Sequence, residues 1–382
     1  MKAYTALLNK AIANSEGLST SEVMALLTPP GLVAARRLWQ TAHLLRLNAT
    51  GKCVHLRAII EFSNYCRQDC LYCGLRRSNN RVTRYRMTPE AIVEAAIEAH
   101  AVHKFGTFVL QSGEDPGYEL KNLKWAVQEI KLATNAAITL SIGERSCGVY
   151  RALWEAGAGR FLLKFETSCG QIFRKLKPTT TLEQRLGCLG TLRSLDYQVG
   201  SGIILGLPGQ DLESVANDLL LCRDEDYEMV SIGPFIPHPD TPLSSANIAT
   251  NVCSTLTTIA VARLLVPYAH MPATTALGVI GQNDKWWKSK APQLQDARSL
   301  ALMAGANVLM LDVTPAKYRT SYSIYPGKAG ADGDVITDSV WQAKKDLSTL
   351  GMTICPGRGD SPKQPWGRGN TDVKREDRMH VY

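Results

Sequence analysis

The sequence predicts an α/β fold of the (β/α)8 TIM-barrel type, with a helical extension before the barrel and an irregular tail after it. Eight short apolar runs alternate with longer amphipathic segments between about residues 54 and 313. Each short run is almost continuously apolar, as parallel strands are when both of their faces are covered. The alternative is an open doubly wound sheet. It is less favoured because no glycine-rich phosphate loop follows the first run.

The expected strands and helices alternate along the chain. The strands are predicted at 54–62, 107–111, 137–142, 160–165, 198–205, 229–234, 271–277 and 307–313. The helices between them are predicted at 88–104, 120–134, 148–156, 182–195, 211–226, 254–266 and 292–304. Gly157 and Gly305 stand where glycines that end helices are common.

Two extensions flank the predicted barrel, which we place at 51–345. Residues 1–50 read as helices and form the N-terminal extension. Residues 346–382 form the C-terminal extension, which from Gly357 onward is rich in Gly, Pro and charged residues and is expected to be extended or disordered. The stretch 281–296, with Trp286 and Trp287, is expected to be an insertion at the mouth of the barrel.

Composition limits the class of protein. The chain has 382 residues, of which 45% are hydrophobic and 20% charged, as in ordinary globular proteins. Its net charge of +8 indicates an anionic small-molecule ligand rather than nucleic acid, because no RNA-binding signature is present. No signal peptide and no apolar run of membrane-spanning length is found. Ten scattered cysteines favour a reducing, cytoplasmic location over a secreted disulfide scaffold.

The most informative motif is Cys66, Cys70 and Cys73, spaced C-x3-C-x2-C directly after the first predicted strand. Three thiolates on one short loop suit three irons of a [4Fe–4S] cluster and leave the fourth iron open to a small molecule. A structural zinc site would instead use a closed set of four ligands. The alternative is that the three residues are ordinary buried thiols or part of a zinc knuckle.

Polar residues follow the other predicted strands, at the end of the barrel where catalysis takes place in this fold. The turn around Gly113 and Glu114 would let a carboxylate approach an ammonium group closely. Glu166 and Arg185 would suit a ligand's hydroxyl, ammonium or carboxylate groups, or would form an ion pair at the rim. Further polar side chains at or beyond strand ends are Gln111, Thr139, Ser141, Thr274, Thr275, Tyr322 and Tyr325.

Arg57 lies inside the first predicted strand. A buried arginine needs an anionic partner, which is either a bound anion or an internal carboxylate. In a closed barrel, strands 1 and 7 are separated only by strand 8, so Arg57 is expected near Thr274 and Thr275. A guanidinium beside two hydroxyls would make an anion site.

The cysteine spacing resembles the signature of the radical S-adenosylmethionine (SAM) superfamily. That resemblance implies a [4Fe–4S] cluster with one open iron, SAM as cofactor, and Tyr72 packed near the adenine. Ser112-Gly-Glu114 resembles the family's Gly-Gly-Glu motif, with serine in place of the first glycine. The implied SAM contacts are Tyr72, Glu114, Ser141, Glu166 and Arg185.

Longer strings resemble the HydE family of [FeFe]-hydrogenase maturases over about residues 50–330, at 61–77, 85–90, 110–116, 233–243 and 272–278. This resemblance implies a 5′-deoxyadenosyl radical that acts on the sulfur of an Fe(CO)2(CN)(cysteine) precursor of the diiron subcluster. It implies a reductant protein and other hydrogenase maturases as partners. The implied substrate contacts are Arg57, Gln111, Thr139, Thr274, Thr275, Tyr322 and Tyr325.

One departure from the family pattern concerns a second, peripheral iron–sulfur site. Many relatives carry cysteines just after the Tyr-Pro-Gly-Lys string, but here Tyr325–Lys328 is followed by no cysteine before Cys355, so no second cluster is expected. Two alternatives stay open: a radical SAM mutase acting on an amino-acid-derived substrate, similar to methylornithine synthase, and a non-enzymatic Fe–S scaffold. Sulfur insertion of the biotin synthase kind is less favoured, because the predicted strands offer no interior set of cysteines.

Overall fold

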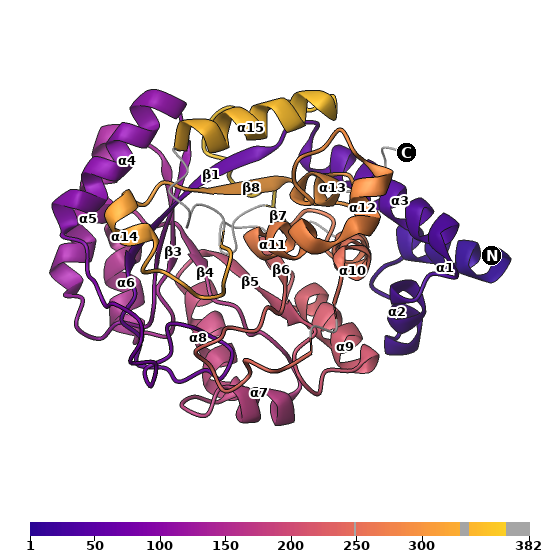
Figure 1. Ribbon diagram of the computed structural model, residues 1–382, viewed down its shortest axis with the longest axis horizontal. Coiled ribbons are helices and arrows are strands. Elements are labelled where there is room, and N and C mark those ends of the chain that lie inside the picture. Colours follow the sequence, from indigo (N-terminus) through magenta and orange to yellow (C-terminus); the bar gives the residue numbers. More distant parts are fainter. Residues whose placement is uncertain (248–249, 329–335, 364–382) are drawn as a thin grey trace.

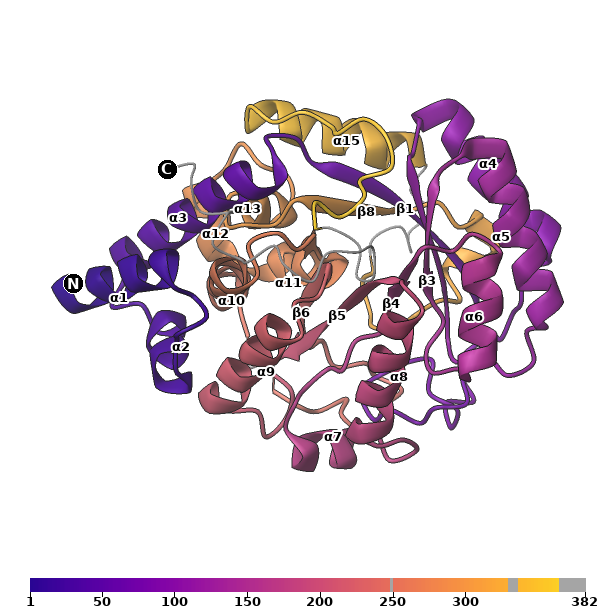
Figure 2. The same cartoon turned by 180° about the vertical axis from the view of Figure 1, so that it is seen from behind.

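Eight parallel strands form one sheet in the order β6-β5-β4-β3-β2-β1-β8-β7. The computed structural model describes residues 1–247, 250–328 and 336–363, and Figures 1 and 2 show helices surrounding the curled sheet. The two edges meet through a bridge between Met229 and His270, which nearly closes the barrel. The predicted fold class is therefore confirmed. The strands are β1 (His55–Ser63), β2 (Thr107–Ser112), β3 (Ala137–Ser141), β4 (Arg160–Leu162), β5 (Gln198–Leu205), β6 (Met229–Pro234), β7 (Pro272–Ala273) and β8 (Val308–Asp312).

The seventh strand differs most from its prediction. It spans only Pro272–Ala273, and the helix α11 begins at Thr275 and runs to Asn283. Thr274 has an extended backbone and stands directly before the helix. The prediction of strand structure over 274–277 is wrong, because a short apolar run fits the start of a buried helix as well as a strand.

The helices follow the strands in the expected rhythm, with additions. They are α1 (Lys2–Ala13), α2 (Thr20–Leu27), α3 (Leu32–Thr50), α4 (Pro89–His103), α5 (Leu120–Thr134), α6 (Cys147–Glu155), α7 (Gly170–Leu176), α8 (Leu182–Ser194), α9 (Leu212–Asp224), α10 (Val252–Leu265), α12 (Lys285–Lys290), α13 (Arg298–Leu302), α14 (Ala316–Arg319) and α15 (Ile336–Thr349). The helix predicted at 292–304 is reduced to α13. The expected domain boundary at 345 falls inside α15. No helix among the described residues is both long and apolar enough to cross a membrane.

The N-terminal helices α1–α3 lie on one side of the barrel, beside α9 and α10 (Figures 1 and 2). The side chain of Ser19 accepts a hydrogen bond from the backbone N–H of Glu22, and the Glu22 carboxylate accepts one from the backbone N–H of Ser19. This capping box fixes the start of α2. Trp39 of α3 packs edge-on against Trp286 of α12, with ring centroids 6.2 Å apart. The stretch 281–296 is thus held against the N-terminal extension.

The opposite end of the barrel from the expected active site is crossed by residues 352–363, which we call the strap. The strap contains no helix and, apart from one bridge at Ile354, no paired strand, as expected for an irregular extension. It is nevertheless fixed: Thr107 and Arg160, at the starts of β2 and β4, donate hydrogen bonds to the Arg358 carbonyl. Cys355 forms a disulfide with Cys53. The rest of the predicted tail, 364–382, lies outside the described residues.

Candidate functional site

The three motif cysteines lie on the loop that follows β1, at the C-terminal end of the barrel. They are free thiols that line one cavity. The loop is tied to the barrel, because the backbone N–H of Arg67 donates to the carbonyl of Glu114 over 2.9 Å. The ammonium of Lys177 donates to the sulfur of Cys70 over 3.2 Å. This lysine would offset negative charge on a thiolate.

Burial shapes the chemistry of these thiols. It raises the pKa of Cys66 and of Cys73, and the neighbouring Cys70 adds to the rise in both. Iron binding would have to displace those protons, because the thiolate is the metal ligand. Among the described residues, no three His, Cys, Asp or Glu side chains are arranged to hold a single metal ion. Three thiols on one loop that line a cavity without converging on one point suit a multi-iron cluster better than zinc.

Beside the cysteine loop lies a buried network of charges around Arg185. Its guanidinium contacts a carboxylate oxygen of Glu114 at 3.3 Å and one of Glu144 at 3.2 Å. The amide of Gln68 also donates to Glu114 over 2.6 Å. Burial would raise the pKa of Glu114, but Arg185 and Gln68 outweigh it and leave the pKa below its usual value. Glu114 therefore presents a negative charge next to the cysteine loop.

Two glycines allow Glu114 to sit there. A Cβ on Gly113 would lie 2.2 Å from the backbone oxygen of Tyr65. Gly143 has φ of +74°, and a Cβ on it would lie 1.8 Å from the Glu114 side chain. Since real Cβ atoms do not approach so closely, both positions require glycine, and only Gly113 belongs to the motif seen in the sequence.

Glu166 stands apart from Arg185 and pairs with Lys164, whose Nζ lies 3.1 Å from its carboxylate. Glu166 and Arg185 therefore each form an ion pair, as the alternative prediction allowed, but with other partners and not with each other. Glu166 also has φ of +70°, a left-handed backbone conformation that is strained for a side chain of this size. Such strain is often kept at functional sites, and it aims Glu166 into the cavity that the cysteines line.

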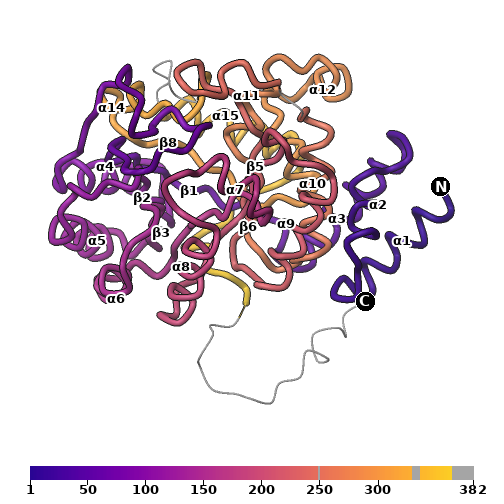
Figure 3. The backbone as a smooth tube through the Cα atoms, turned by 90° about the horizontal axis from the view of Figure 1, so that it is seen from below, coloured from indigo at the N-terminus to yellow at the C-terminus, as the bar shows by residue number. Residues whose placement is uncertain are grey.

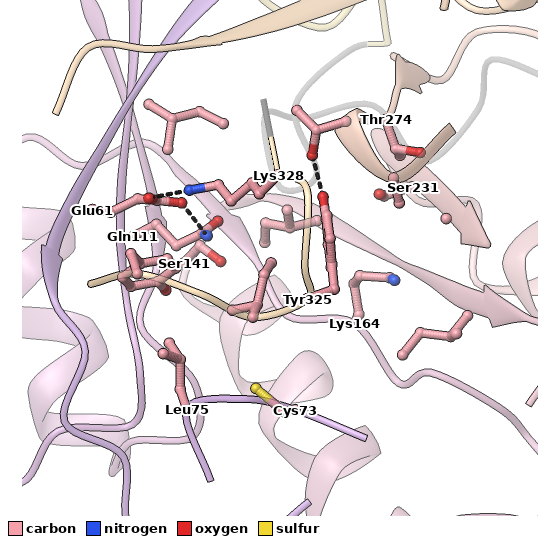
Figure 4. Close-up of a pocket in the computed structure, with 18 of the residues that line it drawn as sticks. Glu61, Cys73, Leu75, Gln111, Ser141, Lys164, Ser231, Thr274, Tyr325 and Lys328 are labelled. Atoms are coloured by element: carbon pink, nitrogen blue, oxygen red, sulfur yellow. Dashed lines mark hydrogen bonds and ion pairs between the residues drawn. The ribbon is translucent and has the colours of Figure 1, made fainter. Parts of the chain in front are cut away.

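A single cavity of about 360 Å³ brings most of the predicted site together. Figure 4 shows side chains from several strands converging on it, with Cys73 on one side and Thr274 and Tyr325 on another. Tyr325 exchanges a hydrogen bond with the hydroxyl of Thr275. Thirteen of the predicted residues line it: Cys66, Cys70, Tyr72, Cys73, Gln111, Glu114, Ser141, Glu166, Arg185, Thr274, Thr275, Tyr322 and Tyr325.

Arg57 and Thr139 do not line this cavity. Both are buried, and Arg57 lies near the N-terminal end of β1 while Thr139 lies in the middle of β3. The Nη1 of Arg57 lies 3.2 Å from the sulfur of Met229, while its Nε and Nη2, and the hydroxyl of Thr139, have no hydrogen-bond partner. Burial and the nearby Arg160 lower the pKa of Arg57 to about 9. The internal carboxylate considered for Arg57 is not found in contact with it among the described residues.

The sequence reasoning missed a buried cluster in the cavity wall. Lys328 donates to the carboxylate of Glu61 (Figure 4) and lies 3.3 Å from that of Asp312. Gln111 donates to the other Glu61 oxygen. Burial raises the pKa of Glu61, Lys328 opposes that rise, and Asp312 adds to it. The sequence does carry a signal for this cluster, because an acid such as Glu61 within the apolar run 54–62 is as unusual as Arg57 in the same run.

A second hollow, of about 750 Å³, lies outside the barrel among α5, α6 and α8. It is lined by residues such as Tyr118, Leu123 and Val149 and contains none of the motif cysteines. Despite its larger volume, it lies away from the chemistry described above.

Comparison with known proteins agrees with this geometry. The family model described as the radical SAM superfamily matches residues 60–222. Over 293 residues, the chain is 46% identical to the [FeFe] hydrogenase maturase subunit HydE of Thermotoga maritima, covering 76% of this chain and 79% of that protein. This chain belongs to the HydE family of radical SAM enzymes. It is also 30% identical to the 3-methylornithine synthase of Methanosarcina acetivorans, over 68% of this chain and 74% of the relative.

Solved structures show the same fold. A methylornithine synthase (PylB) superposes with a TM-score of 0.75 at 26% identity, covering 91% of this chain and 97% of that chain. The [FeFe]-hydrogenase maturase HydG superposes with a TM-score of 0.68 at 19% identity, covering 81% of this chain and 68% of that one, which shows the shared fold. The family implies a [4Fe–4S] cluster and SAM, and the cysteine loop with the Glu114–Arg185 network fits both.

Proposed function

We propose that this protein acts in the maturation of [FeFe] hydrogenase, as its Thermotoga relative is named to do. In this proposal Cys66, Cys70 and Cys73 hold the cluster, while Tyr72, Glu114, Ser141, Glu166 and Arg185 hold SAM. When bound, the cluster would supply the electron that cleaves SAM to a 5′-deoxyadenosyl radical. The substrate is a cysteine-bearing iron complex with carbonyl and cyanide ligands, supplied by one partner maturase, and the product passes to another.

The observation that carries the proposal is the continuity of the cavity. The same 360 Å³ space touches the cysteine loop and the hydroxyls of Thr274, Thr275 and Tyr325. A substrate held by those hydroxyls would lie within reach of a radical formed near Glu114, and buried walls would keep water away from it. The residues of this chain thus bind, orient and enclose the reactants.

We also propose that the chain carries only one cluster. No cysteine stands between Lys328 and Cys355, and Cys355 is paired with Cys53.

A second candidate is a mutase reaction like that of 3-methylornithine synthase, favoured by the 30% identity and the PylB superposition. The deciding experiment offers the reduced, reconstituted protein SAM together with either the iron complex or a mixture of free amino acids. Mass spectrometry then looks for a 5′-deoxyadenosyl group on the cysteine sulfur, or for methylornithine. The thioether supports maturation, methylornithine supports the mutase, and Cys70→Ala serves as the inactive control for both.

Arg57 and Thr139 would extend the substrate site below the cavity as an anion site. The support is that two Arg57 nitrogens and the Thr139 hydroxyl are buried without partners. We expect thiocyanate to bind there, and Arg57→Ala to weaken it by about 1.5–3 kcal/mol, as for a hydrogen bond to a charged group. SAM affinity, measured in parallel by calorimetry, should stay nearly unchanged. Equal thiocyanate affinity in both proteins would contradict this part of the proposal.

A further inference from the structure

We propose that the outer surface of the cysteine loop and α7 is the docking site of a small acidic protein that carries single electrons. The site is a basic collar formed by Arg77, Arg174 and Lys175. The proposal rests on the radical SAM chemistry of the family and not on the identity of the substrate. The step transfers one electron from the carrier to the cluster site, so the carrier is oxidised by one electron and no atom changes place.

The fold joins the three collar residues around the cysteine loop. The backbone N–H of Leu71 donates to the carbonyl of Leu176 over 2.9 Å, so the last turn of α7, which carries Arg174 and Lys175, is pinned to the loop. The backbone N–H of Arg77 donates to the carbonyl of Gln68 over 2.8 Å and brings Arg77 beside the middle of the same loop. Figure 3 shows α7 on the face of the molecule turned toward the viewer, away from the N-terminal helices.

Charge is concentrated here to an unusual degree. Residues 66–86 and 169–179 contain nine basic residues against one acid, Asp69, which is a net charge of +8 when the cysteines are left aside. That equals the net charge of the whole chain, so the remaining residues are balanced. A patch of one sign attracts a partner of the other sign and speeds its encounter.

The collar residues are the exposed basic residues of this region that have no ion pair within the described ranges. Other arginines of the region are neutralised, since Arg76 pairs with Asp69 and Arg81 with Asp240. The three collar side chains are exposed, and within the described ranges none of them has a hydrogen bond or an ion pair. Glu183, at the start of α8, is the acid that Arg174 influences, and it is itself exposed.

The position of the collar favours an electron carrier over nucleic acid. Cys66, Cys70 and Cys73 line the cavity, and the exposed collar side chains belong to segments that are hydrogen-bonded to the same loop. Transient electron-transfer complexes have small interfaces and are electrostatically steered, which suits a compact basic surface. A nucleic-acid interface with about 6–10 phosphate contacts would need more basic residues than this collar provides.

The test compares two reductants on matched variants. Arg174→Glu/Lys175→Glu reverses two collar charges, and Arg36→Glu/Lys52→Glu reverses two exposed charges on and just after α3. Formation of 5′-deoxyadenosine is measured with reduced flavodoxin, an acidic carrier protein, and with reduced methyl viologen, a small cation. We expect the collar variant to lose about 10-fold or more of the flavodoxin-driven rate at low salt, with a flatter salt dependence. Its viologen-driven rate and iron content should match wild type, and the control variant should match in all three.

Two results would overturn the proposal outright, and a third would pass the decision to Arg77→Glu. Unchanged flavodoxin-driven rates would remove the docking site. Equal loss with both reductants would indicate damage to the cysteine loop, and Arg77→Glu, which lies outside α7, would then have to reproduce the selective loss for the proposal to stand. Binding of RNA that the collar variant abolishes would assign the surface to nucleic acid. Failure of the iron complex to react would leave this test intact, because SAM cleavage alone is the readout.

Discussion

The two ends of the barrel use cysteine in opposite ways. At the C-terminal end, three cysteines of one loop remain free and line the cavity. At the N-terminal end, Cys53 and Cys355 are 302 residues apart in sequence, have Cα atoms 4.9 Å apart and are bonded to each other. The comparison teaches that backbone placement decides the role of a thiol. The loop after β1 leaves its three sulfurs unbonded and available to iron. The strap brings Cys355 onto Cys53, so neither sulfur is available.

The same contrast holds for buried arginine. At the C-terminal end, Arg185 faces carboxylates of Glu114 and Glu144 beside the proposed SAM site. At the N-terminal end, Arg160 donates to the strap, through the Arg358 carbonyl and the carboxylate of Asp360. One end is built to bind ligands and the other to hold the chain together, and each prediction below tests that division.

The largest difference is expected between Cys70→Ala and Cys355→Ser. Wild-type protein reconstituted with iron and sulfide should hold about four irons per chain. Cys70→Ala should abolish both the cluster and SAM cleavage, because the cubane loses a ligand. Cys355→Ser should keep both. Iron analysis and chromatography of 5′-deoxyadenosine measure the outcome, and about seven or eight irons in the wild type would contradict the single-cluster proposal.

The second difference concerns stability. Under oxidising conditions, Cys355→Ser should lower the free energy of unfolding by about 2–5 kcal/mol, because the disulfide closes a very long loop. With excess reductant, wild type and variant should unfold at the same denaturant concentration. Cys147→Ser, which changes an exposed free thiol, is the matched control and should have no effect in either condition. A wild type indifferent to reductant would mean that the strap is held without the disulfide.

The third comparison replaces one buried arginine at each end. Arg185→Gln should weaken SAM binding by about 1.5–3 kcal/mol, the usual value of a hydrogen bond to a charged group. Arg160→Gln should leave SAM affinity unchanged and loosen the strap, seen as faster proteolysis after residue 350. Calorimetry on the reconstituted protein measures the first effect. Equal SAM affinity in the two variants would break the division between the ends.

The smallest effect is a dependence on pH at the N-terminal end. The ring of His270 accepts from Asn307 and donates to the carbonyl of Asp360, which fixes its neutral form. Burial, with Arg57 and His55 nearby, lowers its pKa well below the usual value. A lowered histidine pKa means stability that is present above about pH 6.5 and is lost as the pH falls, by about 1.4 kcal/mol per unit. His270→Gln should reduce that slope in unfolding curves between pH 7 and 5, and an unchanged slope would place the acid sensitivity elsewhere.

Much of the fold could be predicted because buried parallel strands appear in the sequence as continuous runs of apolar residues. The expected runs at 198–205 and 229–234 coincide with β5 and β6. Where an apolar run is short, as at 271–277, strand and helix look alike, and α11 was missed. The N-terminal helices were predicted as a region, and the capping box at Ser19 that begins α2 is the kind of local signal that a sequence carries.

The site could be predicted as a set of residues but not as a set of contacts. The cysteine spacing identifies the loop because its ligands are close in sequence. The pairing of Arg185 with Glu114 and Glu144, the burial of Lys328 against Glu61, and the Cys53–Cys355 bond each join distant parts of the chain. Such pairs depend on the tertiary fold, and no local pattern announces them.

Among the described residues, the strap covers the end of the barrel opposite the cysteine loop. Its contacts with Thr107, Arg160 and His270 close the end beneath Arg57. If SAM occupies the proposed site at Glu114 and Glu166, a molecule bound deeper in the barrel would have to enter before SAM and leave after it. Substrate would then be the first molecule to bind, and its product would be the last to leave. The C-terminal extension, far from the chemistry, would in this way impose the sequence of events at the other end.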